Sequence, residues 1–412
     1  MTTIDIRSAD IELRERAARV VPNGMYGHMS MARMPDAYPQ FMSHGEGARL
    51  WDVNGKEYVD LMCGWGPIVL GRQNRIVDHA MTKQLAQGDC LNGPGPIMVD
   101  LAELLVDTIP SADWAMFAKN GTDATTTCVT IARAATGRRV VLMANGAYHG
   151  AIPWCTPITA GVIDEDRAHL RYFDYNDVKS LRAAVAEAGE DLAAIIVSPV
   201  RQETQRDQEE ALPEFAREIR ALATAAGAVM VVDDVRCGFR LDIRGSWESL
   251  GVRPDLSAWS KAIANGNPLA AVTGIDSLRD SASSIFVTGS FWFAPPAMAA
   301  ALATITILRE TDAIVHTQAM AQRMRDGLEL QAAHHGLRIR QSGPAAMPLL
   351  LFTDDDAQLT MGNYWANACV SRGVYLHPWH NWFFSAAHQA ADIDLALERT
   401  DEAFALTAAS LS

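Results

Sequence analysis

The sequence contains few lysines and no cluster of basic residues. Only 5 of its 412 residues are lysine, and 49 acidic residues against 35 basic ones give a net charge of −14. Binding to nucleic acid needs Lys and Arg side chains gathered against the phosphates, so we expect no nucleic-acid partner. Because lysine is so rare, a lysine that lies beside other reactive residue types is a candidate for chemistry.

Long apolar runs and paired cysteines are also missing. No apolar stretch reaches the roughly 18 residues that a membrane-spanning helix needs, and residues 1–21 lack the apolar core of a signal peptide. The 6 cysteines are scattered, with no CxxC pair and no histidine cluster beside them, as is typical of free thiols in a reducing compartment. We therefore expect a cytoplasmic protein without a membrane partner or a metal site.

Strands and helices alternate through the middle of the sequence. Apolar strands are predicted at 115–118, 139–144, 193–198 and 228–234, and helices at 98–109, 123–136, 177–188 and 213–226. Continuous apolar strands that alternate with helices indicate an α/β fold, with a mostly parallel sheet covered on both faces. We predict a large α/β domain at 61–305 and a smaller α+β domain built from both chain ends, 1–60 and 306–412.

Polar residues follow three of these predicted strands and one further short strand-like segment, at the strand ends where open α/β sheets bind their ligands. Asn120, Gly121 and Thr122 form a glycine turn into a helix, where N–H groups and the Thr122 hydroxyl can bind an anion or simply cap the helix. Tyr148 and His149 lie in a glycine-flanked loop. An aromatic ring there can stack on a flat ligand or be partly buried in a turn.

The other two groups carry charge. A fully apolar strand runs into Asp233 and Asp234, whose side chains point to opposite faces, so that one can meet a ligand while the other serves the structure. Lys261 follows a short strand-like segment, and a lysine removed from water has a lowered pKa and becomes a nucleophile. A phosphate cradle, a stacking ring, a buried carboxylate and such a lysine are together the parts that hold pyridoxal 5′-phosphate (PLP).

These residues resemble those of the class III, fold-type-I PLP-dependent aminotransferases, in the branch that contains glutamate-1-semialdehyde aminomutase. The segments similar to the family pattern are NGTDA (120–124), GAYHG (146–150), VVDDVRCGFR (231–240) and GVYLHPWHNWFFSAAH (373–388). The resemblance covers nearly the whole chain. It implies PLP fold type I, with a mostly parallel seven-stranded sheet, and a homodimer with shared active sites.

The resemblance also assigns cofactor contacts by position. Lys261 matches the lysine that forms the Schiff base, and Asp233 matches the aspartate that pairs with the pyridine nitrogen. Val235 would pack behind the ring and Tyr148 in front of it, while Ser290 matches a threonine that reaches the phosphate of the partner subunit. The other expected cofactor contacts are Asn120, Gly121, Thr122, His149 and Arg236.

Substrate residues are predicted where the sequence departs from the family pattern. The candidates are aromatic or charged: Tyr26, Trp65, Arg201, Glu203, Arg236, Phe291 and Trp379. Ordinary core or interface packing explains each of the aromatic residues equally well. Arg236 is the preferred carboxylate ligand, because a planar guanidinium binds a carboxylate with two hydrogen bonds. Glu203 could pair with an arginine and release it between two substrates.

The predicted activity is that of an aminotransferase with small-molecule amine and carbonyl substrates. An amine or amino acid donor leaves its amino group on the cofactor as pyridoxamine phosphate, and a keto acid, aldehyde or ketone then accepts it. An intramolecular aminomutase of the glutamate-1-semialdehyde type is one alternative, although residues 25–34, MYGHMSMARM, lack the Ser-Pro-x-Arg pattern associated with it. Another PLP reaction, such as elimination or decarboxylation, is a second. A catalytically dead binding protein is disfavoured by Lys261 and Asp233.

Overall fold

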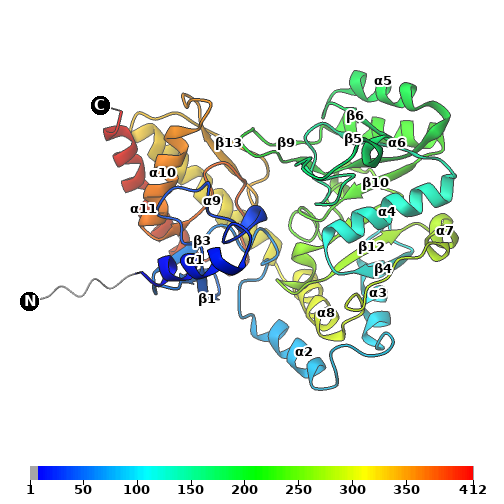
Figure 1. The fold of residues 1–412 in the computed structure, drawn as a ribbon, viewed down its shortest axis with the longest axis horizontal. Coiled ribbons are helices and arrows are strands. Elements are labelled where there is room, and N and C mark those ends of the chain that lie inside the picture. The colour runs from blue at the N-terminus through cyan, green and yellow to red at the C-terminus, as the bar shows by residue number, and fades with distance from the viewer. Residues whose placement is uncertain (1–7, 412) are drawn as a thin grey trace, which may run out of the picture.

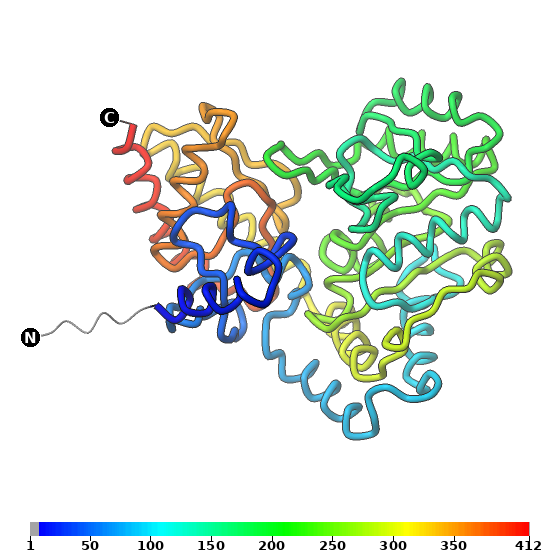
Figure 2. Tube along the Cα trace, in the orientation of Figure 1, coloured from blue at the N-terminus to red at the C-terminus, as the bar shows by residue number. Residues whose placement is uncertain are grey.

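The computed structural model describes residues 8–411. Residues 1–7 and 412, which belong to the two terminal segments predicted to form the smaller domain, lie outside the described residues. Figure 1 shows a larger body that holds the main sheet, next to a smaller body that holds both ends of the described chain. The tube in Figure 2 shows the blue N-terminal and the orange and red C-terminal segments together in the smaller body. Within residues 8–411, no helix is long and apolar enough to cross a membrane.

A seven-stranded sheet forms the centre of the larger body. Across the sheet, the order is β4 (Trp114–Ala118), β12 (Ala270–Gly274), β11 (Leu256–Trp259), β10 (Val229–Asp233), β7 (Leu192–Val197), β5 (Val140–Ala144) and β6 (Leu170–Phe173). Strand β12 runs antiparallel to both of its neighbours, and all other pairs are parallel. The predicted mostly parallel sheet of seven strands is therefore confirmed.

Helices cover both faces of this sheet, which explains the continuous apolar strands. In β10, Val231 packs on the side of α4 (Gly121–Thr136), whereas Val232 packs with α5 (Val178–Ala188) and α6 (Pro213–Ala226). The further helices of this body are α2 (Arg75–Leu85), α3 (Ile97–Thr108), α7 (Arg279–Ser284) and α8 (Pro295–Glu310). Because helices cover both faces of the sheet, the ends of its strands are the places left open for a site.

The smaller body joins both ends of the chain in one sheet. Strands β1 (Met42–Glu46), β2 (Arg49–Asp52) and β3 (Glu57–Asp60) are antiparallel, and β15 (Val374–Tyr375) is parallel to β3. The remaining elements are α1 (Ala9–Val20), α9 (Ala313–His334), α10 (Thr360–Ser371), α11 (Ala390–Ala409), β13 (Ile339–Ser342) and β14 (Leu349–Phe352). Tyr58, Leu328, Trp365 and Phe404 share one buried cluster, which supports a small domain from both chain ends. Its boundaries near 60 and 305 stay a prediction.

The pattern of apolar residues does not reveal every element. Strand β6 lies at the edge of the sheet and exposes Tyr172, so its sequence does not read as a buried strand. Strand β12, AAVTG, consists of small residues, of which only Val and Thr favour strands while Ala and Gly do not. The long helical stretch after residue 295 is divided at Thr311 and Asp312 into α8, in the larger body, and α9, in the smaller one.

Candidate active site

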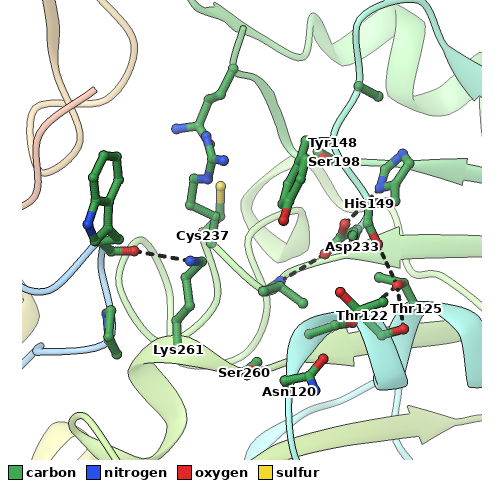
Figure 3. A pocket seen from close by; sticks show the side chains of 18 of the residues that line it. Asn120, Thr122, Thr125, Tyr148, His149, Ser198, Asp233, Cys237, Ser260 and Lys261 are labelled. Atoms are coloured by element: carbon green, nitrogen blue, oxygen red, sulfur yellow. Dashed lines mark hydrogen bonds and ion pairs between the residues drawn. The ribbon is translucent and has the colours of Figure 1, made fainter. Parts of the chain in front are cut away.

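A cavity of about 550 Å³ lies beyond the carboxyl ends of the parallel strands (Figure 3). Tyr148 follows β5, Ser198 follows β7, Asp233 ends β10 and Lys261 follows β11, so each side chain enters from a different strand. The predicted site residues in its lining are Asn120, Gly121, Thr122, Tyr148, His149, Asp233, Val235, Arg236, Lys261, Trp65 and Arg201. Residues widely separated in the sequence thus meet at the sheet edge where such folds bind ligands.

Lys261 is held in an unusual backbone conformation at the cavity. Strand β11 ends at Trp259, and Lys261 begins a 3₁₀ turn with φ = +46°, in the left-handed region. Its Nζ donates a hydrogen bond to the carbonyl oxygen of Trp65 at 3.1 Å, and Trp65 itself has φ = +69°. Removal from water, and then the charges of Arg236 and Arg240, lower the pKa of Lys261 to about 7. This amine can therefore be neutral at a pH where an ordinary lysine is charged.

Asp233 is buried at the end of β10 and held on both carboxylate oxygens. His149 Nδ1 lies 2.7 Å from Asp233 Oδ2, and the Val235 backbone N–H donates to Oδ1 at 3.1 Å. Asp234 points to the other face, as the strand alternation predicts, and accepts hydrogen bonds from the Ser246 hydroxyl and N–H. Burial raises the pKa of Asp234 to about 7. Only Asp233 is available to the cavity.

The start of helix α4 forms one wall of the cavity. Asn120 Oδ1 accepts from the Asp123 N–H at 3.2 Å, and Asp123 Oδ2 accepts from the Asn120 N–H at 3.1 Å, a reciprocal capping box. The N–H groups of Gly121 and Thr122 begin the helix, where no intrahelical acceptor exists, so they can bind an anion.

Gly121 fits this wall closely against Val235. A Cβ on Gly121 would lie 2.6 Å from Val235 Cγ1, so only glycine lets the helix start so close to this side chain. The residues that face this wall carry a carboxylate and an amine, and the wall itself offers free N–H groups. That donor set suits PLP: the start of α4 would hold its phosphate, Asp233 would meet its pyridine nitrogen and Lys261 would reach its aldehyde carbon. Residues 8–411 contain no group of three or more His, Cys, Asp or Glu placed to bind a metal ion.

Several predicted site residues lie outside the lining of this cavity. Tyr26 is 67% exposed and Phe291 is 61% exposed, with the Lys119 ammonium 5.2 Å from the Phe291 ring centre. Ser290 is also exposed, and its carbonyl oxygen accepts from Cys90 Sγ at 3.5 Å. The structure does not bring these three side chains to the Lys261 amine within one chain.

Glu203 and Trp379 lie behind the lining rather than in it. Glu203 Oε1 accepts from Arg201 at 2.7 Å, and Glu209 accepts from the same guanidinium at 2.5 Å. The Trp379 carbonyl oxygen accepts from the Gln205 N–H at 2.9 Å. Arg201 lines the cavity, and its side chain is only 4% exposed. Because Glu203 and Glu209 both pair with its guanidinium, the charge of Arg201 is already balanced.

Other residues in or beside the cavity were not predicted from the sequence. His28 lines the cavity through a 3₁₀ turn, Gly27–Met29, that no periodic pattern indicates. Arg240 is fully buried and donates to the carbonyl oxygens of Gly66 and Phe384, which fixes the loop that carries Trp65. The only sequence signal for Arg240 was its place at the end of the segment VVDDVRCGFR.

Known proteins are similar to this chain in both sequence and fold. The model of the class III aminotransferase family matches residues 30–389. The chain belongs to this family. It is 49% identical over 393 residues to the aminopentol aminotransferase of Sphingopyxis macrogoltabida, covering 95% of this chain and 93% of that protein. It is 32% identical to the glutamate-1-semialdehyde 2,1-aminomutase of Bordetella avium (strain 197N), covering 97% and 99%.

The fold comparison agrees with this family assignment. The PLP internal aldimine form of the FumI protein of Sphingopyxis sp. MTA144 matches with a TM-score of 0.96 at 48% identity, covering 98% of this chain and 97% of that one. This class III enzyme is therefore a PLP-dependent aminotransferase of fold type I, and the predictions of family, fold, activity and cofactor are confirmed. The aminomutase alternative is not favoured, since the relative at 49% identity is an aminotransferase.

Proposed function

We propose that this aminotransferase moves the amino group of a hydroxylated amine to a keto acid, with Lys261 as the group that carries the proton. One observation carries the proposal: a lysine whose pKa is lowered to about 7 lies in the same cavity as a buried aspartate and an open helix start. Bound PLP supplies an electron-withdrawing ring that takes up the electrons of a breaking C–H bond. The protein residues supply everything else.

Each lining residue has a distinct task in this proposal. Lys261, whose lowered pKa leaves much of its amine neutral near pH 7, takes the proton from the donor carbon and returns it, as general base and then general acid. Asp233 keeps a negative charge against the pyridine nitrogen, and His149 fixes the orientation of that carboxylate through the 2.7 Å contact. Tyr148 and Val235 would pack on the two sides of the ring, while Gly121 and Thr122 would bind the phosphate.

The donor class is suggested by the relative at 49% identity. Its name specifies an aminopentol, an amine that carries five hydroxyl groups. Such a donor has no carboxylate next to the amino group, so its binding depends on hydrogen-bonding and aromatic side chains rather than on an arginine. The wall formed by Trp65 and His28 supplies side chains of this kind.

For the acceptor, Arg236 is the available cation. Its Nη1 donates to the neutral Asn381 Oδ1 at 3.2 Å, and no carboxylate in residues 8–411 forms an ion pair with it. Arg201 is less suitable, because Glu203 and Glu209 already occupy its guanidinium. Arg236 can therefore bind the carboxylate of a keto acid with two hydrogen bonds.

A homodimer with shared active sites is part of the proposal. Ser290 lies on the surface next to Cys90, close to the exposed apolar side chains of Leu91 and Phe291. Apolar side chains exposed together are typical of a protein interface. A partner seated there would meet Ser290, which the single chain leaves outside its own cavity. A cytoplasmic location stays the expectation from the free cysteines.

A substrate panel tests the proposed function. The purified holoenzyme is supplied with primary amines and amino polyols as donors and pyruvate or 2-oxoglutarate as acceptors, and both products are measured. Transfer should need both substrates, and Lys261→Ala should abolish it. Arg236→Gln should raise the KM for the keto acid about tenfold or more while leaving the KM for the donor unchanged. Release of ammonia or CO₂ without an acceptor would contradict the proposal.

A further inference from the structure

We infer that His28 and His380, on two edges of the Trp65 ring, form a subsite that binds hydroxyl groups of the amine donor. This inference rests on the proposed function, because it names the residues that would distinguish a hydroxylated donor from a plain alkyl amine. The relevant feature is a cluster of imidazole rings around Trp65, referred to below as the Trp65 cluster and consisting of His28, Trp65, His377 and His380.

Trp65 is the centre of this cluster and lies beside the reacting amine. The ring centres of His28, His377 and His380 are 5.0, 5.4 and 4.9 Å from that of Trp65. All three imidazoles meet it at steep angles, 85°, 63° and 81°. The Trp65 carbonyl oxygen accepts the hydrogen bond of Lys261 Nζ at 3.1 Å, so a donor carbon at Lys261 has its neighbouring carbons near this cluster.

The imidazoles of the cluster are neutral around pH 7. Burial, and then the charge of Lys261, lower the pKa of His28. Burial, followed by the charge of Arg236 and the neighbouring His377, lowers the pKa of His380 well below its usual value. A neutral imidazole has one N–H donor and one acceptor nitrogen, which suits a hydroxyl group and does not attract a carboxylate. These imidazoles therefore differ in chemistry from the Arg236 guanidinium.

The hydrogen bonds of His380 leave one nitrogen free. His380 Nδ1 lies 2.7 Å from the carbonyl oxygen of Asn381, which can only accept, so Nδ1 carries the proton and Nε2 is an acceptor. Among residues 8–411, neither His380 Nε2 nor either ring nitrogen of His28 has a hydrogen-bond partner. His28 lines the cavity directly. His380 is not among the lining residues, but it is partly exposed and close enough to Arg236 and Lys261 for their charges to lower its pKa.

Packing alone does not account for these residue types. At position 380, phenylalanine would meet the edge of Trp65 equally well, without the cost of a largely buried ring nitrogen that lacks a partner, whereas His28 is exposed and its ring nitrogens can meet water. Asn381 further ties the cluster to the acceptor side, since its carbonyl oxygen accepts from His380 and its Oδ1 accepts from Arg236. The donor and acceptor subsites are thus adjacent but chemically distinct.

A matched pair of donors tests the inference. The wild-type holoenzyme and its His28→Phe and His380→Phe variants are compared with 2-aminoheptane and 2-amino-3-heptanol, with pyruvate as acceptor. Wild type should prefer the amino alcohol in kcat/KM, and each variant should lose about tenfold for that donor alone, the effect of one lost neutral hydrogen bond. His28→Asn and His380→Asn, which keep a polar group, should recover part of the preference.

A binding measurement separates this inference from the proposed function. Calorimetric titration of the holoenzyme with 2,3-heptanediol, which carries no amine, should detect binding that the His→Phe variants weaken about tenfold. If neither amine is converted, the proposed function fails, and the calorimetry alone decides on the subsite. Equal losses for both donors in the variants, no preference in wild type, or diol binding unchanged by both substitutions would each overturn the inference.

Discussion

The lowered pKa of Lys261 predicts how the apoprotein captures its cofactor. An amine must be neutral to attack an aldehyde, and at pH 7 a lysine with the usual pKa of 10.5 is neutral in about three molecules in ten thousand. With a pKa of about 7, roughly half of the Lys261 amines are neutral at that pH. At pH 7, Lys261 should therefore capture PLP on the order of a thousand times faster than a lysine with an unperturbed pKa.

The direction of the pH dependence follows from the same pKa. Below pH 7 Lys261 is mostly protonated, so capture slows tenfold for each further pH unit; above pH 7 the rate should level off. An ordinary lysine would instead give a rate that keeps rising through pH 10. The rate is read from the visible absorbance of the bound cofactor after it is mixed with apoprotein from pH 5.5 to 10. Borohydride reduction and peptide mapping then identify Lys261 as the residue modified.

A charge variant tests the physical cause. Removal from water lowers the pKa of Lys261 most, and the charge of Arg236 is the second largest cause. Arg236→Gln should therefore shift the midpoint of the plot of capture rate against pH to higher pH. Arg206→Gln is the matched control, because the Arg206 side chain is 63% exposed and pairs with Glu203. A wild-type midpoint above pH 9, or the same midpoint in wild type and Arg236→Gln, would refute the reasoning.

Three further substitutions have expected outcomes set by their contacts. Asp233→Asn should leave the protein folded and lower kcat about a hundredfold or more, as measured in steady-state assays with the cofactor at saturation, because the buried charge at the pyridine nitrogen is lost. Gly121→Ala should weaken PLP binding at least about tenfold in an equilibrium titration, since its Cβ would lie 2.6 Å from Val235 Cγ1; unchanged affinity would show that this wall does not touch the cofactor. Gly274→Ala should reduce the free energy of unfolding in urea by about 1–3 kcal/mol, because its Cβ would lie 2.2 Å from Trp114, and it should leave kcat unchanged.

Much of the fold and the cofactor site could be predicted because both depend on local sequence patterns. Strands β5 and β7 are fully apolar, and β10 is apolar up to Asp233. A residue that lines the cavity ends or directly follows each of them, so strand ends and site residues were found together. Strand β12 was missed because its small residues carry no such pattern. Its antiparallel direction between β4 and β11 results from tertiary pairing, which no single segment encodes.

The substrate side of the cavity was harder to predict for a physical reason. Whether an arginine is free or paired depends on backbone that brings distant carboxylates to it. The short pairing of β8 (Val200–Arg201) with β9 (Glu209–Glu210) places Glu209 on the Arg201 guanidinium, and strands of two residues leave no recognisable pattern. His28 reaches the cavity through a turn rather than through a helix or strand, and Ser290 lies outside the single chain's cavity.

An aminotransferase must bind two substrates in turn at one place, and the described contacts suggest how this chain does so. A donor with hydroxyl groups needs neutral partners, which the Trp65 cluster offers, whereas a keto acid needs a cation, which Arg236 offers. Arg201 would attract a carboxylate to the wrong position if it were free, and its two carboxylate partners prevent this. Because Asn381 contacts both His380 and Arg236, a change at Asn381 should weaken the binding of both substrates, while changes at His28 and Arg236 should each weaken the binding of only one. The neighbouring Trp65 cluster and Arg236 would then determine the substrate specificity of the enzyme, whereas Lys261 would react with any bound substrate.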